Sequence, residues 1–357
     1  MNRKPKDAER LEDVHISSFS TLPTPAEVKR DYPVSAAAAA TTAAARQAIR
    51  QVLRRESNRF VMVAGPCSVH HPGGALDYAR RLKSLAGAVA DRMLVVMRVY
   101  VEKPRTTVGW KGLIYDPDLD GSCDIAKGLH LARRLMLDIA GLGLPVGTEV
   151  LDPVIPQYLA DLIAWGVIGA RTTESQTHRQ LVSGLSMPTG FKNPTDGNIR
   201  VAIEAITTAA APHSFLGVTS EGRSGFFRTT GNRDCHLILR GGTSGPNYGA
   251  EHVAYGRVMM EKLGIPANIM IDCSHANSGK SAERQADVLA DALKQVAAGE
   301  RAIVGAMLES YLRPGRQDIG ARGTVKPDIS VTDECIGWEE TESLVRKAYE
   351  TLGKRKR

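Results

Sequence analysis

The 357-residue sequence has few aromatic residues and no long apolar segment. No apolar run reaches the roughly 18 residues that a membrane span needs, so we expect no transmembrane helix. Aromatic residues make up only 5% of the chain. The net charge of +7 therefore lacks the interleaved aromatics and the large basic face that are typical of nucleic-acid binding. We expect neither a membrane nor a nucleic acid as a partner.

Cysteine pairs are also lacking. The five cysteines are scattered, and no two of them form a CxxC motif. An odd number at such spacings argues against a disulfide framework and favours a reducing compartment. Residues 1–10 are charged and are followed by no apolar segment, which argues against a secretory signal. We therefore expect a cytoplasmic protein.

Eight short apolar runs recur along the chain, most of them separated by segments with helical periodicity. Continuous runs rich in Val, Ile and Leu are typical of parallel strands that are buried on both faces. Eight such strands alternating with helices predict an α/β protein with a (β/α)8 TIM barrel. The predicted strands are 60–64, 94–97, 145–148, 167–170, 187–191, 235–239, 269–273 and 302–308. The predicted helices include 73–89, 125–141, 157–165, 198–209, 282–297 and 339–352.

Two segments lie outside this alternation. Residues 1–55 begin as a polar, proline-punctuated arm and continue into an alanine-rich helix over 35–55, which we expect to pack across one end of the barrel. Residues 213–231 hold two β-like runs and predict a hairpin inserted before the sixth barrel strand. We expect an N-terminal regulatory or assembly segment in 1–55 and a catalytic barrel in 56–357, because insertions that stand off a scaffold commonly regulate or assemble.

Each predicted strand leads to a residue that carries a charge or can bind a metal. The carboxyl ends of the strands form the active site of a (β/α)8 barrel, so we expect these side chains to share one rim. They are Cys67, Arg98, Glu149, Arg171, Lys192, Arg240, His275 and Glu309.

Four residues are candidates for a metal site. Cys67, His275 and Glu309 offer a thiolate, an imidazole and a carboxylate, a set suited to a divalent first-row transition metal. Asp333, in the loop before the last predicted helix, can complete the set. Taken singly, each has a structural alternative: a packed thiol, a hydrogen-bonded loop histidine, an ion-pair partner or a turn N-cap. Their convergence on one rim favours the metal site.

Six cations near the same rim predict an anion-binding site. Arginine and lysine are rarely buried without a partner. Ion pairs with Glu102, Glu149 or Glu174 are the structural alternative, but the cations outnumber these acids. Phosphate and carboxylate groups of substrates are natural partners for them. The six are Arg98, Lys103, Arg105, Arg171, Lys192 and Arg240.

Seven motifs resemble those of class I 3-deoxy-D-arabino-heptulosonate 7-phosphate (DAHP) synthases. They are AGPCS at 64–68, MRVYVEKPRTTVGWKG at 97–112, GARTTES at 169–175, GFKNPTDG at 190–197, HLILRGG at 236–242, IDCSHANS at 271–278 and IGWE at 336–339. The similarity runs through about residues 12–350. It implies condensation of phosphoenolpyruvate with erythrose 4-phosphate, the first step of the shikimate pathway to aromatic amino acids.

The resemblance implies roles for individual residues. Cys67, His275, Glu309 and Asp333 match the ligands of one divalent ion, which is Mn2+, Fe2+, Co2+ or Zn2+. Arg98, Lys103, Arg171, Lys192 and Arg240, with Glu149 close by, match the phosphoenolpyruvate site, and Arg105 and Thr106 match the erythrose 4-phosphate site. Lys103 is the first candidate for the proton donor, with His275 and metal-bound water as competitors.

The resemblance also implies feedback regulation in a homodimer or homotetramer. In the family, the arm and the hairpin form a pocket for an aromatic amino acid across a subunit contact. Gly217 matches a position that tends to be glycine in tyrosine-sensitive forms, and the segment 14–16 also resembles those forms, so we expect tyrosine as the effector, near Gly217, Phe215 and Leu185. The structural alternative is that Gly217 eases a strand twist and the arm only assembles the oligomer.

Two other functions are compatible with parts of this pattern. A 3-deoxy-D-manno-octulosonate 8-phosphate synthase would share the fold and the first substrate, but the KPRT block at 103–106 resembles the tetrose-specific version. A non-catalytic anion-binding barrel would be expected to have lost some of the ligand and cation set, which is complete here.

Overall fold

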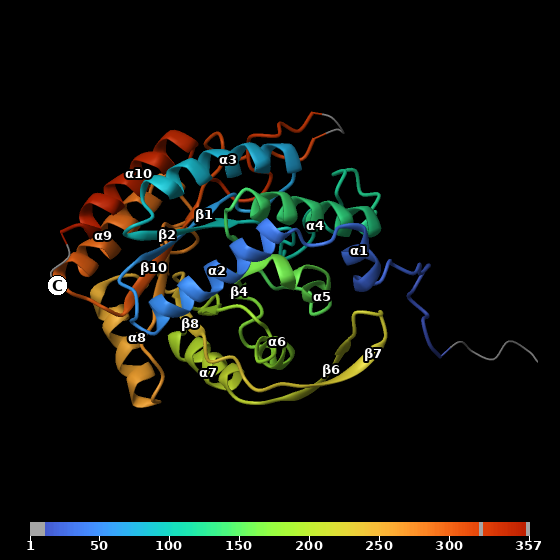
Figure 1. Cartoon of the computed structure of the whole chain (residues 1–357), viewed down its shortest axis with the longest axis horizontal. Helices are drawn as coiled ribbons and strands as arrows, with labels where there is room; N and C mark the ends of the chain where they lie inside the picture. The colour runs from blue at the N-terminus through green and yellow to red at the C-terminus, as the bar shows by residue number, and fades with distance from the viewer. Residues whose placement is uncertain (1–10, 321–323, 355–357) are drawn as a thin grey trace, which may run out of the picture.

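The computed structural model describes residues 11–320 and 324–354 (Figure 1). Its centre is a closed barrel of eight parallel strands in the order β1-β10-β9-β8-β5-β4-β3-β2, which confirms the predicted (β/α)8 barrel. The strands are β1 (Phe60–Gly65), β2 (Met93–Arg98), β3 (Val146–Glu149), β4 (Ile163–Ile168), β5 (Thr189–Lys192), β8 (Cys235–Leu239), β9 (Ile269–Asp272) and β10 (Ile303–Glu309).

Helices surround the barrel and cover the outer faces of its strands (Figure 1). Their apolar residues recur at helical spacing and pack against the strands in one large core, as an amphipathic helix requires. The helices that follow the strands are α3 (Pro72–Ala88), α4 (Ile125–Gly141), α5 (Ile155–Leu159), α6 (Gln176–Val182), α7 (Ile199–Ala210), α8 (Ala250–Lys262), α9 (Gln285–Ala298) and α10 (Trp338–Leu352).

The boundary before the fourth barrel strand differs from the prediction. The helix expected over 157–165 is wrong in its second half, because α5 ends at Leu159, a 3-10 turn covers Ala160–Leu162, and β4 begins at Ile163. Trp165 lies inside the barrel, where its Nε1 donates to His236 Nε2 on β8 at 3.1 Å. A short apolar run carries no periodicity that separates a buried helix from a buried strand.

The alanine-rich segment forms α2 (Ala36–Leu53), which closes the amino-terminal end of the barrel as expected. The Ser35 side chain caps the helix by accepting from the Ala38 amide. Ile49, Val52 and Leu53 then pack against the side chains that fill the barrel interior.

The segment before this helix is not wholly extended. It contains the short α1 (Pro25–Asp31), which begins with a capping box made by Thr24 and Glu27.

The predicted hairpin is present and stands apart from the barrel sheet. β6 (Ser214–Val218) pairs antiparallel with β7 (Ser224–Arg228) as a two-stranded ribbon (Figure 1). Its turn contacts the arm, because the Ala26 amide donates to Ser220 O at 2.8 Å. Leu216 and Phe226 leave 83% and 62% of their surface exposed on the ribbon.

Two features bear on the expectations from composition. All five cysteines are free thiols. Within 11–320 and 324–354, no helix combines the length and apolarity that crossing a bilayer requires.

Candidate active site

The ionisable residues that follow the strands gather around one cavity at the carboxyl end of the barrel. This cavity has a volume of about 240 Å³. Its lining includes all eight residues expected to bind substrate, together with two of the expected metal ligands. These are Arg98, Lys103, Arg105, Thr106, Glu149, Arg171, Lys192, Arg240, His275 and Asp333.

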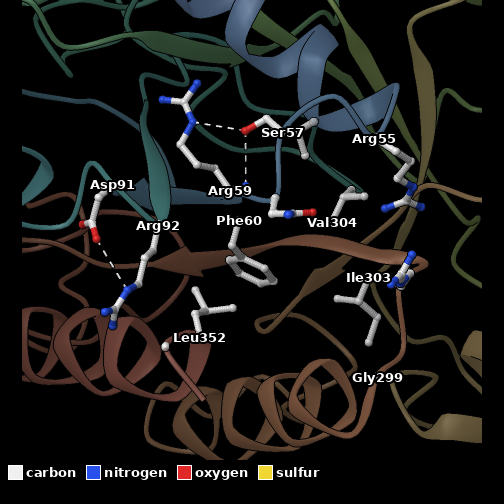
Figure 2. Close-up of a pocket in the computed structure, with 14 residues that line it drawn as sticks. Arg55, Ser57, Arg59, Phe60, Asp91, Arg92, Gly299, Ile303, Val304 and Leu352 are labelled. Carbon is white, nitrogen blue, oxygen red and sulfur yellow. Dashed lines mark hydrogen bonds and ion pairs between the residues drawn. The ribbon is translucent and has the colours of Figure 1, made fainter. Parts of the chain in front are cut away.

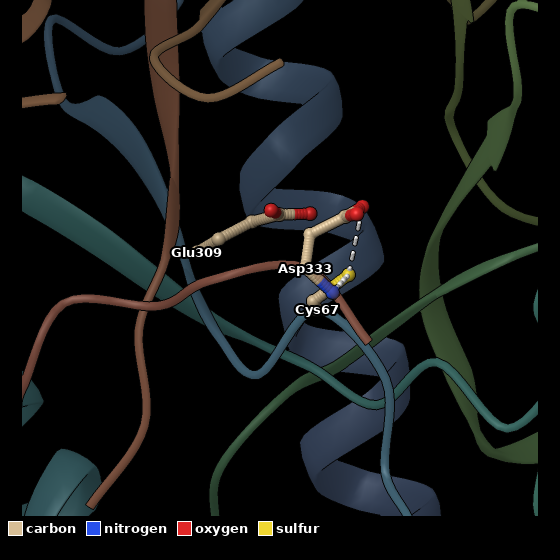
Figure 3. Close-up of side chains that lie close together, drawn as sticks. All are labelled: Cys67, Glu309 and Asp333. Carbon is tan, nitrogen blue, oxygen red and sulfur yellow. Dashed lines mark hydrogen bonds between the residues drawn. The ribbon is translucent and has the colours of Figure 1, made fainter. Parts of the chain in front are cut away.

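Three of the four expected metal ligands form a tight group. Ligand atoms of Cys67, Glu309 and Asp333 all lie within 4.8 Å of one another, and the three side chains point toward a common centre (Figure 3). The barrel sheet brings the first two together, since Gly65 on β1 pairs with Glu309 on β10 and Cys67 follows two residues later. Asp333 comes from the loop before α10, and its Oδ2 lies 3.3 Å from Cys67 Sγ.

His275 lies beside this group. Its Nε2 is 3.8 Å from Glu309 Oε1, while its Nδ1 is 3.0 Å from Asp272 Oδ2. The backbone of His275 has a φ of 57°, a left-handed conformation that is costly for a residue other than glycine. The loop therefore holds the imidazole with one nitrogen against Asp272 and the other toward Glu309.

The chemistry of these four groups fits a divalent cation. Burial and the neighbouring Glu309 raise the pKa of the Cys67 thiol to about 12, although Lys103 Nζ lies only 2.7 Å from its sulfur and opposes this shift. A thiol and two carboxylates this close repel one another when ionised. A bound divalent ion relieves that repulsion and favours the thiolate, and a mixed S, N and O donor set suits a first-row metal.

The cations of the cavity are only partly neutralised by acids. Arg98 is 1% exposed, contacts Glu309 Oε1 at 3.1 Å and lies over the Tyr100 ring at 3.9 Å. Its Nη1 is buried and has no hydrogen-bond partner in the described part of the chain. A buried donor of this kind is rare in a folded protein unless a ligand completes it.

Arg171 and Arg240 form no ion pair with any of the described residues. Arg171 Nη2 donates to Thr106 Oγ1 at 2.8 Å, and Arg240 Nη1 donates to Gly241 O at 3.3 Å. Burial and the nearby Arg171 lower the pKa of Arg240, although Asp272 opposes this shift. Two neighbouring guanidinium groups without acids form a region of positive potential that attracts an anion.

The structural alternative, in which the cations pair with Glu102, Glu149 or Glu174, is wrong about which acids are the partners. Three cations of the site do form ion pairs, but the acids are others: Glu309 for Arg98, Asp333 for Lys103 and Asp272 for Lys192. These acids are distant in sequence from the cations, so charge counting along the chain could not assign them.

Glu149 and Glu102 occupy other positions. Glu149 ends β3 and lines the cavity, and the absence of a side chain at Gly169 leaves room for its carboxylate. Glu102 is buried and is not part of this lining, and burial and the nearby Asp152 raise its pKa to about 8.

Asp272 is a site residue that the sequence analysis missed. It is fully buried, and its Oδ2 contacts both Lys192 Nζ at 2.7 Å and His275 Nδ1 at 3.0 Å. Burial alone would raise the pKa of this carboxyl, but His275 and Lys192 outweigh it and hold the pKa well below its usual range. The signal was present, because Asp272 is the last residue of β9. The predicted strand 269–273 includes Asp272 in its interior, so the sequence pattern does not mark this residue as a strand ending.

Two of the expected effector residues, Phe215 and Gly217, lie on the hairpin strand β6, and Leu185 lies in the loop after α6. Phe215 stacks on Phe227 with ring centroids 5.8 Å apart, and Phe215 and Leu185 pack against the core. Gly217 lies beside these rings, where a Cβ atom would approach Phe227 Cε2 to 3.0 Å.

Comparison with known proteins agrees with this geometry. Residues 31–346 match the model of the DAHP synthetase I family. The chain is 52% identical to the Phe-sensitive phospho-2-dehydro-3-deoxyheptonate aldolase of Escherichia coli K12, over 94% of this chain and 96% of the relative. It is 49% identical to the Tyr-sensitive enzyme of the same organism, over 97% of both chains. The solved structure of a phospho-2-dehydro-3-deoxyheptonate aldolase from Francisella tularensis SCHU S4 has a TM-score of 0.94 and 44% identity, covering 96% of this chain and 100% of that one. The chain therefore belongs to the DAHP synthetase I family.

Proposed function

We propose that this protein condenses phosphoenolpyruvate with D-erythrose 4-phosphate to give DAHP and inorganic phosphate, the first step of the shikimate pathway. One observation carries the proposal for this chain: a cavity in which the Cys67, Glu309 and Asp333 group adjoins arginines that no acid neutralises. Its charge and its ligand set suit two phosphorylated substrates and one metal ion.

Arg98, Arg171, Lys192, Arg240 and Lys103 are assigned to phosphoenolpyruvate. Arginine forms bidentate contacts with carboxylate and phosphate, and the unpartnered Nη1 of Arg98 can donate to such a group. Lys192 is held in place by Asp272. The nearby Glu149 adds a carboxylate to the same lining.

Arg105 and Thr106 are assigned to the phosphate of erythrose 4-phosphate. The hydrogen bond from Arg171 to Thr106 joins this loop to the first anion site. Two like unit charges about 4 Å apart cost about 4 kcal/mol at an effective dielectric near 20, so the cations lower the cost of bringing the two substrates together.

Cys67, His275, Glu309 and Asp333 are assigned to one divalent metal ion, which would act as a Lewis acid on the aldehyde oxygen of the sugar phosphate. The general affinity order does not select among Mn2+, Fe2+, Co2+ and Zn2+. His275 Nδ1 lies 3.0 Å from Asp272 Oδ2 and 2.8 Å from Ser274 Oγ, so Nε2 is the ring nitrogen that faces Glu309.

The residues of this chain then control the carbon and proton chemistry. The cations align C3 of phosphoenolpyruvate with C1 of the aldehyde, and a carbon–carbon bond forms there. Water adds at C2, and the bond from C2 to the phosphate oxygen breaks. Lys103 Nζ lies beside both Cys67 and Asp333, where it can deliver a proton to the developing alkoxide.

Feedback inhibition by tyrosine, in a homodimer or homotetramer, is assigned to the arm and the hairpin. Exposed apolar side chains on both segments support a subunit contact there. They are Leu11, Val14, Ile16 and Phe19 on the arm, and Leu216 and Phe226 on the hairpin. Deletion of residues 1–20 is expected to abolish the inhibition. The free cysteines support a cytoplasmic location.

One assay tests the catalytic proposal. Consumption of phosphoenolpyruvate is followed with erythrose 4-phosphate and, separately, with arabinose 5-phosphate. We expect turnover with the tetrose phosphate. Preference for the pentose phosphate would identify an octulosonate synthase, and no turnover with either, in metal-loaded protein, would identify a non-catalytic barrel.

A further inference from the structure

A large cavity with no role in the proposed reaction lies at the amino-terminal end of the barrel. It has a volume of about 990 Å³. Its walls come from the starts of β1 and β10 and from the chain just beyond the carboxyl ends of α2, α9 and α10. β1 separates it from Cys67 by six residues, about 20 Å at ~3.3 Å per residue. The two cavities are therefore at opposite ends of the same strands.

The charge of this cavity is strongly positive. Arg55, Arg59, Arg92 and Arg301 line it, and Asp91 is the one acidic residue in the lining (Figure 2). Some of these arginines have a purely structural role, since cations stabilise the carboxyl ends of helices.

Two of the four arginines are held by backbone carbonyls, and one of these carbonyls lies at a helix end. Arg92 Nη1 donates to Tyr349 O in the last turn of α10 at 3.2 Å, its guanidinium lies 4.3 Å from the centre of the Tyr349 ring, and its Nε is 3.5 Å from Asp91. Arg55 Nη2 donates to Ala267 O at 2.8 Å.

Arg59 and Arg301 remain without an ionic partner. Arg59 Nε makes a long hydrogen bond, 3.4 Å, to Ser57 Oγ. Neither side chain forms an ion pair with any residue in 11–320 or 324–354, although both line the cavity. Guanidinium groups that line one cavity without acidic partners give it a positive potential, which favours binding of an anion.

The cavity also has an apolar part. Phe60, Ile303 and Leu352 lie between the arginines, as Figure 2 shows. Its volume is at the upper end of the usual range for small-molecule sites, roughly 300–1,000 Å³, and far exceeds what an inorganic ion needs. An organic molecule with a phosphorylated end matches this division into an apolar part and a cationic rim.

We propose that this cavity is a second anion site, which binds a phosphorylated organic molecule of nucleotide size. The phosphates lie against Arg59 and Arg301, and the organic part covers Phe60 and Leu352. The site is independent of the catalytic cavity and of the proposed reaction.

ADP is the probe, titrated by isothermal calorimetry without divalent metal into an Arg171→Ala/Arg240→Ala variant. This background weakens anion binding at the catalytic end, because it removes the two arginines there that form no ion pair with any described residue. We expect one ADP per chain, and at least a tenfold rise in Kd when Arg59→Gln and Arg301→Gln are added. Both side chains lie at the protein surface and hold no buried ion pair, so the additional changes should leave the melting temperature unaltered.

Arg134→Gln/Arg200→Gln, in the same background, is the matched control. It removes the same charge from exposed i,i+4 pairs on α4 and α7, with Asp138 and Glu204. ADP affinity should be unchanged in the control. No binding of ADP, an equal loss in the control, or binding of an oligonucleotide but not of ADP would overturn the proposal.

Discussion

Replacement of Asp272 by asparagine is the sharpest test of how the active site is held together. The carboxylate is fully buried and lies against two nitrogen atoms, Lys192 Nζ at 2.7 Å and His275 Nδ1 at 3.0 Å. Asparagine keeps the size of the side chain but removes the negative charge, so Lys192 becomes a buried cation without a partner.

Two magnitudes follow from this geometry. Removing one member of a buried ion pair costs about 3–5 kcal/mol of stability, a large share of the roughly 5–15 kcal/mol that stabilises a typical domain. Loss of the carboxylate that orients a metal-binding histidine lowers metal affinity by about 10–100-fold. We expect both effects in Asp272→Asn, together with a higher KM for phosphoenolpyruvate, because Lys192 loses its anchor.

The measurements are urea unfolding of the metal-free protein and chelator competition for Mn2+. Asp161→Asn is the control, because Asp161 pairs with the buried Arg133 at 2.8 Å, away from the active site. The control should lose stability and keep its Mn2+ affinity. If both variants bind Mn2+ as the unaltered protein does, the role of Asp272 in positioning His275 for the metal is refuted.

Four further outcomes are expected. Chelation should abolish turnover, and added Mn2+ should restore it. Cys67→Ala should fold but stay inactive in an assay with any of the candidate ions. Chelator-resistant activity in this variant would contradict the metal site. Arg105→Ala should raise the KM for erythrose 4-phosphate more than that for phosphoenolpyruvate, and Arg240→Ala should do the reverse, so equal effects in initial-rate measurements would mean that the two anion sites are misplaced. Tyrosine should inhibit more strongly than phenylalanine or tryptophan, and Gly217→Ser should weaken this inhibition. Inhibition by phenylalanine alone would refute the assignment of tyrosine as the effector. If Gly217→Ser lowers the melting temperature but leaves the inhibition unchanged, Gly217 only makes room for an aromatic ring. Burial raises the pKa of Glu102 from 4.5 to about 8, so between these values the folded state holds a proton that the unfolded chain has released. The free energy of unfolding should therefore fall as the pH rises from about 4.5 to about 8. Glu102→Gln should flatten this decline when it is measured by urea unfolding.

The sequence by itself determined the fold class and the rim on which the site lies. Strands that are buried on both faces read as short apolar runs, and each run here leads to an ionisable residue. Since parallel strands all end on the same rim of a barrel, Cys67, Glu309 and Arg240 could be placed near one another without knowledge of their contacts. The alanine-rich helix and the inserted hairpin were also recognisable, because their patterns depend on neighbouring residues.

The tertiary structure alone decided which charges meet. Arg98 pairs with Glu309, 211 residues away, and Lys103 with Asp333, 230 residues away, so neither pair follows from local charge spacing. Asp272 gained its place in the site in the same way, from contacts across the barrel. The arginine-lined cavity at the opposite end is likewise formed by segments that only the closure of the barrel brings together. Local pattern fixes where a strand lies and what ends it, but the partner of a buried charge depends on which distant strand closes the barrel beside it.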